Sequence, residues 1–124
     1  MTQLKMEREA ALKDYLKVVA ALPRVGTLQR LAWMDAWKQG QAEAGRLLLE
    51  SFLPMVVAEA AARRGLGARF DALLAAGNRA LAKALPRACL DVVGFEEALH
   101  GAVVLALKEQ WMKAAEKGRD QKLI

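Results

Sequence analysis

The side chains that most often carry out nucleophilic or acid–base chemistry are scarce in this chain. It has one histidine, one serine and one cysteine, which are His100, Ser51 and Cys89. No Gly-x-Ser-x-Gly turn surrounds the serine, and the sequence contains no phosphate-binding Walker loop. A lone cysteine is most often a small buried apolar residue, and it cannot close an intrachain disulfide. The sequence therefore predicts a protein that is not an enzyme and that has no catalytic residues, no metal site and no cofactor.

Glu96 and Glu97 come closest to a catalytic pair of carboxylates. Adjacent residues on a helix point to different sides, so these two carboxylates do not face one another. Both fall in the first turn of a predicted helix, where the helix dipole favours acidic side chains. His100 follows Phe95 on the same helix, and a partly buried packing role is commoner for such a histidine than a ligand role. Solvation of a helix end is the simpler interpretation of the two glutamates.

The spacing of apolar residues predicts an all-α protein, a compact bundle of five or six helices in a single domain, residues 1–124. Apolar side chains recur three and four residues apart, whereas no stretch alternates long enough for a strand. Thr27 is a candidate N-cap, Gly40 a C-terminal stop, Pro54 the opening of a helix and Pro86 the end of one. The predicted helices cover about 5–21, 28–39, 42–53, 54–64, 68–85 and 94–118, with 119–124 as a frayed tail.

A glycine interrupts the best helical segment of the chain. Residues 70–85 read FDALLAAGNRALAKAL, and Gly77-Asn78 stands at the centre. Glycine inside a helix costs about 1 kcal/mol relative to alanine. Gly77 falls on the same stripe as Phe70, Leu81 and Leu85, so we expect it to permit the close approach of a crossing helix.

Charge and hydropathy suggest where the protein works. Nineteen Lys and Arg residues against fourteen Asp and Glu residues give a net charge of +5, which suits polyanions or acidic protein surfaces. The N-terminal MTQLKMEREA mixes both charges, unlike a signal peptide, and no uncharged stretch is long enough to span a membrane. We expect a cytoplasmic protein without a membrane partner.

Residues 40–78 read GQAEAGRLLLESFLPMVVAEAAARRGLGARFDALLAAGN. This run resembles, without a gap, regions 1.2 to 2.2 of bacterial sigma-70-type transcription factors, which end there in DLIQEGN. The upstream DYLKVVAALPRVGT and the downstream GFEEALHGAVVLALKEQ are similar to the adjoining segments, so the resemblance covers about Asp14 to Gln110. It implies a sigma-2-like helical domain.

The resemblance implies two working helices. In the family, the helix carrying DLIQEGN docks on the clamp helices of the largest RNA polymerase subunit. Here the family's acidic and polar positions are Ala72, Ala75 and Ala76, with Arg79 and Lys83 on the same face, so the docking face has become smooth and basic. The predicted partner-binding residues are Ala72, Ala75, Ala76, Asn78, Arg79 and Lys83.

The next helix of the family melts the promoter −10 element by capturing flipped bases on aromatic rings. In this chain Phe95 persists at the first ring position. The second Phe falls on Glu97, the Tyr on His100, the two Trp on Val103 and Val104, and the base-reading Gln on Leu107. The stacking platform for melting is therefore missing.

Basic residues cluster around the same two helices and predict a weak, sequence-independent site for nucleic acid. We expect them to form one electropositive patch. The predicted nucleic-acid contacts are Arg63, Arg64, Arg69, Arg87, Phe95 and His100, with Arg79 and Lys83 contributing to the patch.

These features predict a sigma-like, non-catalytic, transcription-associated protein. Its expected partners are RNA polymerase core or holoenzyme, or DNA without sequence preference, and it would not open promoters. The alternative is a helical protein–protein interaction module unrelated to transcription, with Ala72, Ala75 and Ala76 as a flat docking strip.

Overall fold

The computed structural model describes residues 2–123, with side chains described through Gly118. Every regular element in this range is a helix, so the predicted all-α class is confirmed, as is a count of five or six helices. The six helices are α1 (Thr2–Ala20), α2 (Thr27–Lys38), α3 (Ala42–Glu50), α4 (Leu53–Ala61), α5 (Phe70–Ala88) and α6 (Phe95–Leu123).

Glycine and proline set most of the boundaries. Pro54 lies in the first turn of α4, as predicted, because its missing amide hydrogen would have no partner there. Gly40 follows α2 with a φ of +96°, a conformation that a residue with a Cβ rarely adopts. Gly65 and Gly67 also have positive φ and form the turn before α5. Helix α4 ends at Ala61, three residues before the predicted end at Arg64.

Three further predicted boundaries are wrong. Pro86 lies inside α5, which ends at Ala88. Proline has no amide hydrogen, so the carbonyl of Ala82 four residues earlier loses its hydrogen bond. Both Pro86 and Ala82 are exposed, so water can reach this carbonyl. Thr27 is the first residue of α2 and Gly26 is its N-cap, because the Thr27 hydroxyl bonds to Glu96 instead. Helix α6 continues beyond Gly118 to Leu123.

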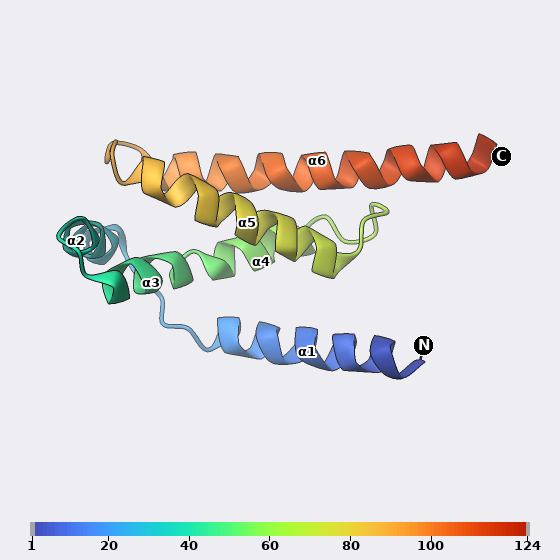
Figure 1. Ribbon diagram of the computed structural model, residues 1–124, viewed down its shortest axis with the longest axis horizontal. Helices are drawn as coiled ribbons and strands as arrows, with labels where there is room; N and C mark the ends of the chain where they lie inside the picture. The colour runs from blue at the N-terminus through green and yellow to red at the C-terminus, as the bar shows by residue number, and fades with distance from the viewer. Residues whose placement is uncertain (1, 124) are drawn as a thin grey trace.

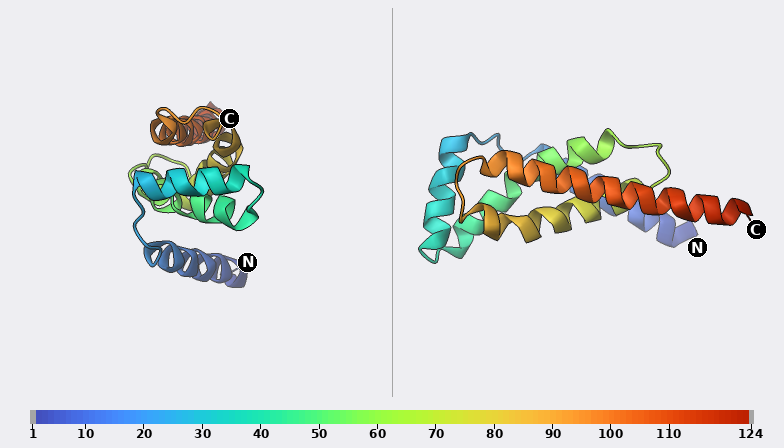
Figure 2. Two further views of the ribbon diagram at one scale, coloured as in Figure 1. Left: turned by 90° about the vertical axis from the view of Figure 1, so that its left-hand side faces the viewer. Right: turned by 90° about the horizontal axis from the view of Figure 1, so that it is seen from above.

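The helices lie in layers around α5 (Figure 1). The antiparallel pair α5 and α6 forms the most extensive helix–helix interface, and α4 packs against both. Helices α2 and α3 pack together at the end where α5 turns into α6 (Figure 1, Figure 2). Helix α1 lies on the outside and contacts α4, with Val19 as its one buried residue. The bundle is therefore organised by α4, α5 and α6.

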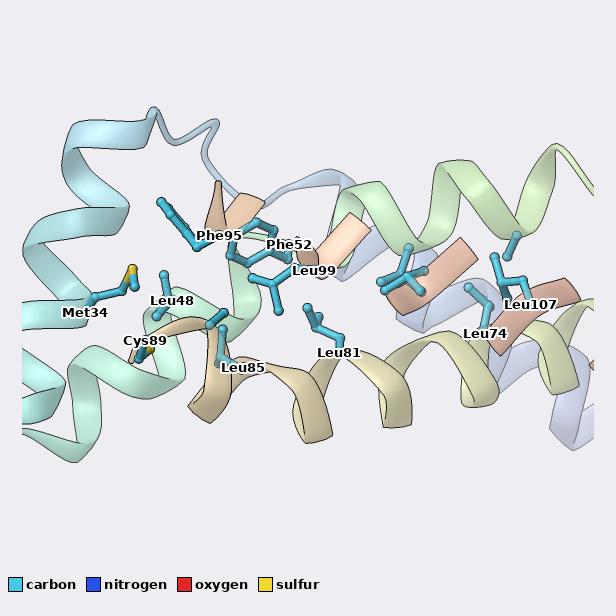
Figure 3. Close-up of a cluster of buried hydrophobic side chains, with 14 of the residues drawn as sticks. Met34, Leu48, Phe52, Leu74, Leu81, Leu85, Cys89, Phe95, Leu99 and Leu107 are labelled. Carbon is cyan, nitrogen blue, oxygen red and sulfur yellow. The ribbon is translucent and has the colours of Figure 1, made fainter. Parts of the chain in front are cut away.

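The core follows the α4–α5–α6 contact from end to end (Figure 3). Its side chains are apolar, and no polar or charged residue is buried among those described. Cys89 is buried and unpaired, as the sequence predicts. The fully buried large side chains are Met34, Leu48, Val56, Leu73, Leu81, Leu99, Val103 and Leu107.

Gly77 is buried where α4, α5 and α6 meet. A Cβ at this position would stand 2.7 Å from Cγ1 of Val56 in α4, and 3.5 Å from side-chain atoms of both Leu107 and Val103 in α6. The first distance is shorter than van der Waals contact allows. The expectation that Gly77 permits close helix packing is confirmed.

Replacing Gly77 by leucine should destabilise the protein by at least about 1 kcal/mol, because overpacking forces α4 or α6 away from α5. The matched control is Gly101→Leu in α6, where an added Cβ would have no neighbouring atom within 4 Å. Leucine there should be neutral or stabilising by up to about 1 kcal/mol. Denaturant titration of both variants measures the difference, and equal effects would remove Gly77 from the helix crossing.

Candidate functional site

The six predicted partner-binding residues do not share one surface. Ala75, Arg79 and Lys83 are exposed on α5, whereas Ala72 is half-buried and Ala76 is only 8% exposed. Ala76 follows Ala75 by about 100° around the helix, which turns it towards the interior. The predicted flat strip of three alanines is therefore absent, and the exposed face is a row of larger basic side chains.

Asn78 serves to hold α1 against α5. Its side-chain amide donates a hydrogen bond of 3.0 Å to the hydroxyl of Tyr15 in α1. The other amide atom, Oδ1, is buried and has no hydrogen-bond partner among the described residues. Asn78 thus has a structural contact that its place in the sequence did not suggest, and it does not belong to the exposed face.

Three of the six positions that the resemblance assigns to promoter melting point into the core. Phe95 is 3% exposed and its ring packs edge-on against that of Phe52, with centroids 6.3 Å apart. Val103 and Leu107 are fully buried. The predicted contact of Phe95 with nucleic acid is wrong, because no base can stack on a ring that is covered by other side chains.

His100 lies on the surface and joins α6 to α4. Its Nε2 is 2.8 Å from Oε1 of Glu59, whose other oxygen accepts a hydrogen bond of 2.8 Å from Arg63. The contacts with His100 and Arg63 hold the pKa of Glu59 below its ordinary value. About half of the His100 side chain is exposed, and the contact that it makes with α4 is the polar one with Glu59.

The predicted basic patch is divided and partly neutralised. Arg63 pairs with Glu59, Arg69 pairs with Asp71 at 2.6 Å, and the guanidinium of Arg64 lies 4.0 Å above the centre of the Phe70 ring. Arg87 lies at the opposite end of α5, which over 19 residues at 1.5 Å each is about 28 Å long. These four arginines therefore form no continuous surface for a phosphate backbone.

A row of unpaired basic residues does remain on α5. Arg79, Lys83 and Arg87 are four residues apart, so they lie on one side of the helix, and all three are exposed. None of them forms an ion pair with a described side chain. We name these three residues the α5 basic row.

The sequence analysis did not predict a partly buried hydrogen-bond network around Arg30. Its guanidinium donates to Glu96 at 2.5 Å and to the backbone carbonyl of Ser51 at 2.7 Å, and lies 3.9 Å above the Phe52 ring. Glu96 also accepts a bond of 2.6 Å from Thr27. These residues lie far apart in the chain, so no local sequence pattern predicts that they are in contact. Glu96 is thus a structural tie between α2 and α6, beyond the predicted solvation of a helix end.

Comparisons with known proteins provide no relative. No family model, no curated protein and no solved structure matches the chain. Within the described part, no helix is both long and apolar enough to cross a membrane. In the same part, no three His, Cys, Asp or Glu side chains gather where they could hold a metal ion. Any inference about function must therefore rest on the surface residues of this structure.

The tie at Glu96 should make stability depend on pH. The Thr27 hydroxyl, together with Arg30, keeps the pKa of Glu96 below its ordinary value despite partial burial. A lowered folded-state pKa stabilises the fold above the ordinary glutamate pKa, and this contribution is lost as the pH falls through the folded-state value.

Glu96→Gln should therefore lower the unfolding free energy at neutral pH, and the deficit should shrink in acid. Its exposed neighbour provides the matched control, because Glu97→Gln removes the same charge from the same helix turn. Chemical denaturation across the acid range measures both. A deficit that is the same for the two variants, or that does not change with pH, would exclude the Glu96 tie.

Proposed function

We propose that this protein is a sigma-like, non-catalytic, transcription-associated protein that binds RNA polymerase and does not open promoters. The resemblance over residues 14–110 motivates the link to transcription. The orientation of α6 supports the other part of the proposal, that the protein does not open promoters. Phe95, Val103 and Leu107 on this helix all face the core. Opening a promoter requires exposed rings at such positions, since each flipped base must be held outside the stack.

The remaining outward positions of α6 also do not suit flipped bases. Glu97 is exposed and carries a charge that repels phosphate, and His100 is engaged by Glu59. Val104 is half-buried and has no π-face. Stacking is worth about 1–3 kcal/mol per base, and these positions carry no Phe, Tyr or Trp ring to supply it. The proposal therefore separates attachment to polymerase from melting of DNA.

The divided arginines favour polymerase over DNA as the partner. A duplex is bound through several adjacent phosphates, and free cations supply most of the affinity that does not depend on sequence. Arg63 and Arg69 are already paired, whereas the α5 basic row is unpaired and lies on the helix that the resemblance assigns to docking. A basic row complements an acidic protein surface, which reverses the charge of the family's docking helix.

The runner-up is a helical interaction module outside transcription. An apolar groove beside the α5 basic row favours it, because such a groove could accept a helix from a protein of any pathway. The two proposals differ in whether purified RNA polymerase is bound.

The protein should fail to replace a sigma factor. Added to bacterial core RNA polymerase on a −10 promoter, it should give no run-off transcript and no permanganate-reactive thymines, whereas a sigma factor gives both. Efficient open-complex formation by the purified chain would refute the proposal.

The protein should lower the transcript yield of a complete holoenzyme through the α5 basic row. Arg79→Glu combined with Lys83→Glu should relieve this effect, because both substitutions reverse exposed charges on the docking helix. The matched control is Lys13→Glu with Lys17→Glu, which makes the same charge change at the same spacing on α1. If the wild-type chain neither binds polymerase nor alters transcription, the interaction module takes the place of this proposal.

A further inference from the structure

A groove of about 700 Å³ runs between α5 and α6. All of its lining residues come from these two helices and the turn between them. The view from above in Figure 2 shows α4 and α5 on opposite sides of α6, so α4 does not cover the groove. Alanines from both helices and Leu99 make up much of the lining, and we call these residues the floor of the groove: Ala80, Ala84, Ala88, Ala98, Leu99, Ala102 and Ala106.

The two walls of the groove differ in chemistry. On the α5 side, Lys83 and Arg87 line the groove, and Arg79 continues the α5 basic row along the same helix. On the α6 side, the wall carries Leu105, which is 57% exposed, and Glu109 at the end away from the turn. Asp91 lines the groove from the turn itself, so the two acidic lining residues lie at its ends and the two basic ones lie along α5. Val93 extends the apolar surface into the turn, where it is 90% exposed. Large exposed apolar side chains beside a groove are typical of a surface that another protein covers.

We propose that this groove binds an amphipathic α-helix of a partner protein, with acidic residues along the flank that faces α5. Alanines on the floor let a third helix approach closely, so that its larger apolar side chains fill the groove. Acidic residues three or four positions apart on that helix would pair with Lys83 and Arg87, in the partly desolvated rim of the interface. Leu105 and Val93 would be covered by its apolar edge.

Charge favours an acidic helix over two other possible occupants, which are a second copy of this chain and a nucleic acid. A second copy of the chain carries a net charge of +5 and would bring a second α5 basic row to the interface. Nucleic acid would meet an apolar floor with one basic wall, whereas phosphates require donors on the surface that they contact. An acidic helix uses both the apolar floor and the basic wall.

This inference deepens the proposed function by giving the chemistry of the contacting element, and it rests on that proposal only for locating the helix in the transcription machinery. A test with isolated peptides needs no polymerase, so the two can fail separately. Loss of peptide binding with polymerase binding intact refutes the groove alone. Peptide binding without polymerase binding refutes the proposed function alone.

The probe is a fluorescent synthetic helix with leucines along one edge and glutamates four residues apart along one flank, compared with an isomer that has lysines in place of the glutamates. Fluorescence anisotropy with the full chain should show binding of the glutamate helix at least about tenfold tighter than that of the lysine helix. Lys83→Glu combined with Arg87→Glu should reverse this preference. Both residues are exposed, and circular dichroism checks that the variant keeps its helicity.

Filling the groove provides an independent check. Ala102→Trp places a large ring on the floor and should abolish binding of the glutamate helix, whereas Ala32→Trp, at an exposed position of α2 outside the groove, should leave it unchanged. The inference is overturned if neither peptide binds, or if the charge-reversed variant keeps the original preference. It is also overturned if sedimentation shows a dimer that Ala102→Trp dissociates, or if duplex DNA alone competes for the groove.

Discussion

The fold depends on the missing side chain at Gly77. Because no Cβ occupies this position, Val56 of α4 and the pair Val103 and Leu107 of α6 close on the same point of α5. This contact fixes the rotation of α6 about its own axis. Phe95, Leu99, Val103 and Leu107 are four residues apart and form the buried stripe. The Gly77 crossing therefore decides which α6 side chains reach the surface.

The orientation of α6 links the packing to the proposed function. Side chains on its buried stripe cannot touch a nucleic acid. The outward positions carry Glu97, which has no ring, and His100, whose imidazole contacts Glu59. Helix α5 has the opposite arrangement, since its outer side keeps an unpaired basic row next to an apolar groove. The exposed chemistry of the α5–α6 pair thus suits a protein partner better than an opened DNA strand.

Local patterns predicted the helices and the crossing at Gly77, but not the other contacts between helices. Apolar spacing and the residues Gly40 and Pro54 identified most elements, and the stripe through Gly77 identified the crossing, because these features involve neighbours in sequence. The predicted helix end at Pro86 is wrong because solvent at the end of α5 tolerates a lost hydrogen bond, which no local rule includes. The orientation of Ala76 follows from the packing of α5 against its neighbours.

The sequence predicted the candidate site only for residues whose exposure depends on their position within one helix. Arg79 and Lys83 were placed correctly on an outer face of α5, since charged side chains seldom point inward. The pairing of Arg63 with Glu59 could have been found from their spacing of four residues. By contrast, Arg30 with Glu96, and Asn78 with Tyr15, join distant parts of the chain, and only the folded structure brings these pairs together.

The central claim of the proposal is that α5 attaches this chain to RNA polymerase. The most direct measurement replaces Arg79 by a photo-reactive amino acid, irradiates the full chain with purified polymerase and identifies the product by mass spectrometry. The account predicts a cross-link to an acidic helical segment of polymerase from position 79 and none from the same probe at Lys13. Cross-links from both positions in equal yield, or from neither, would contradict it.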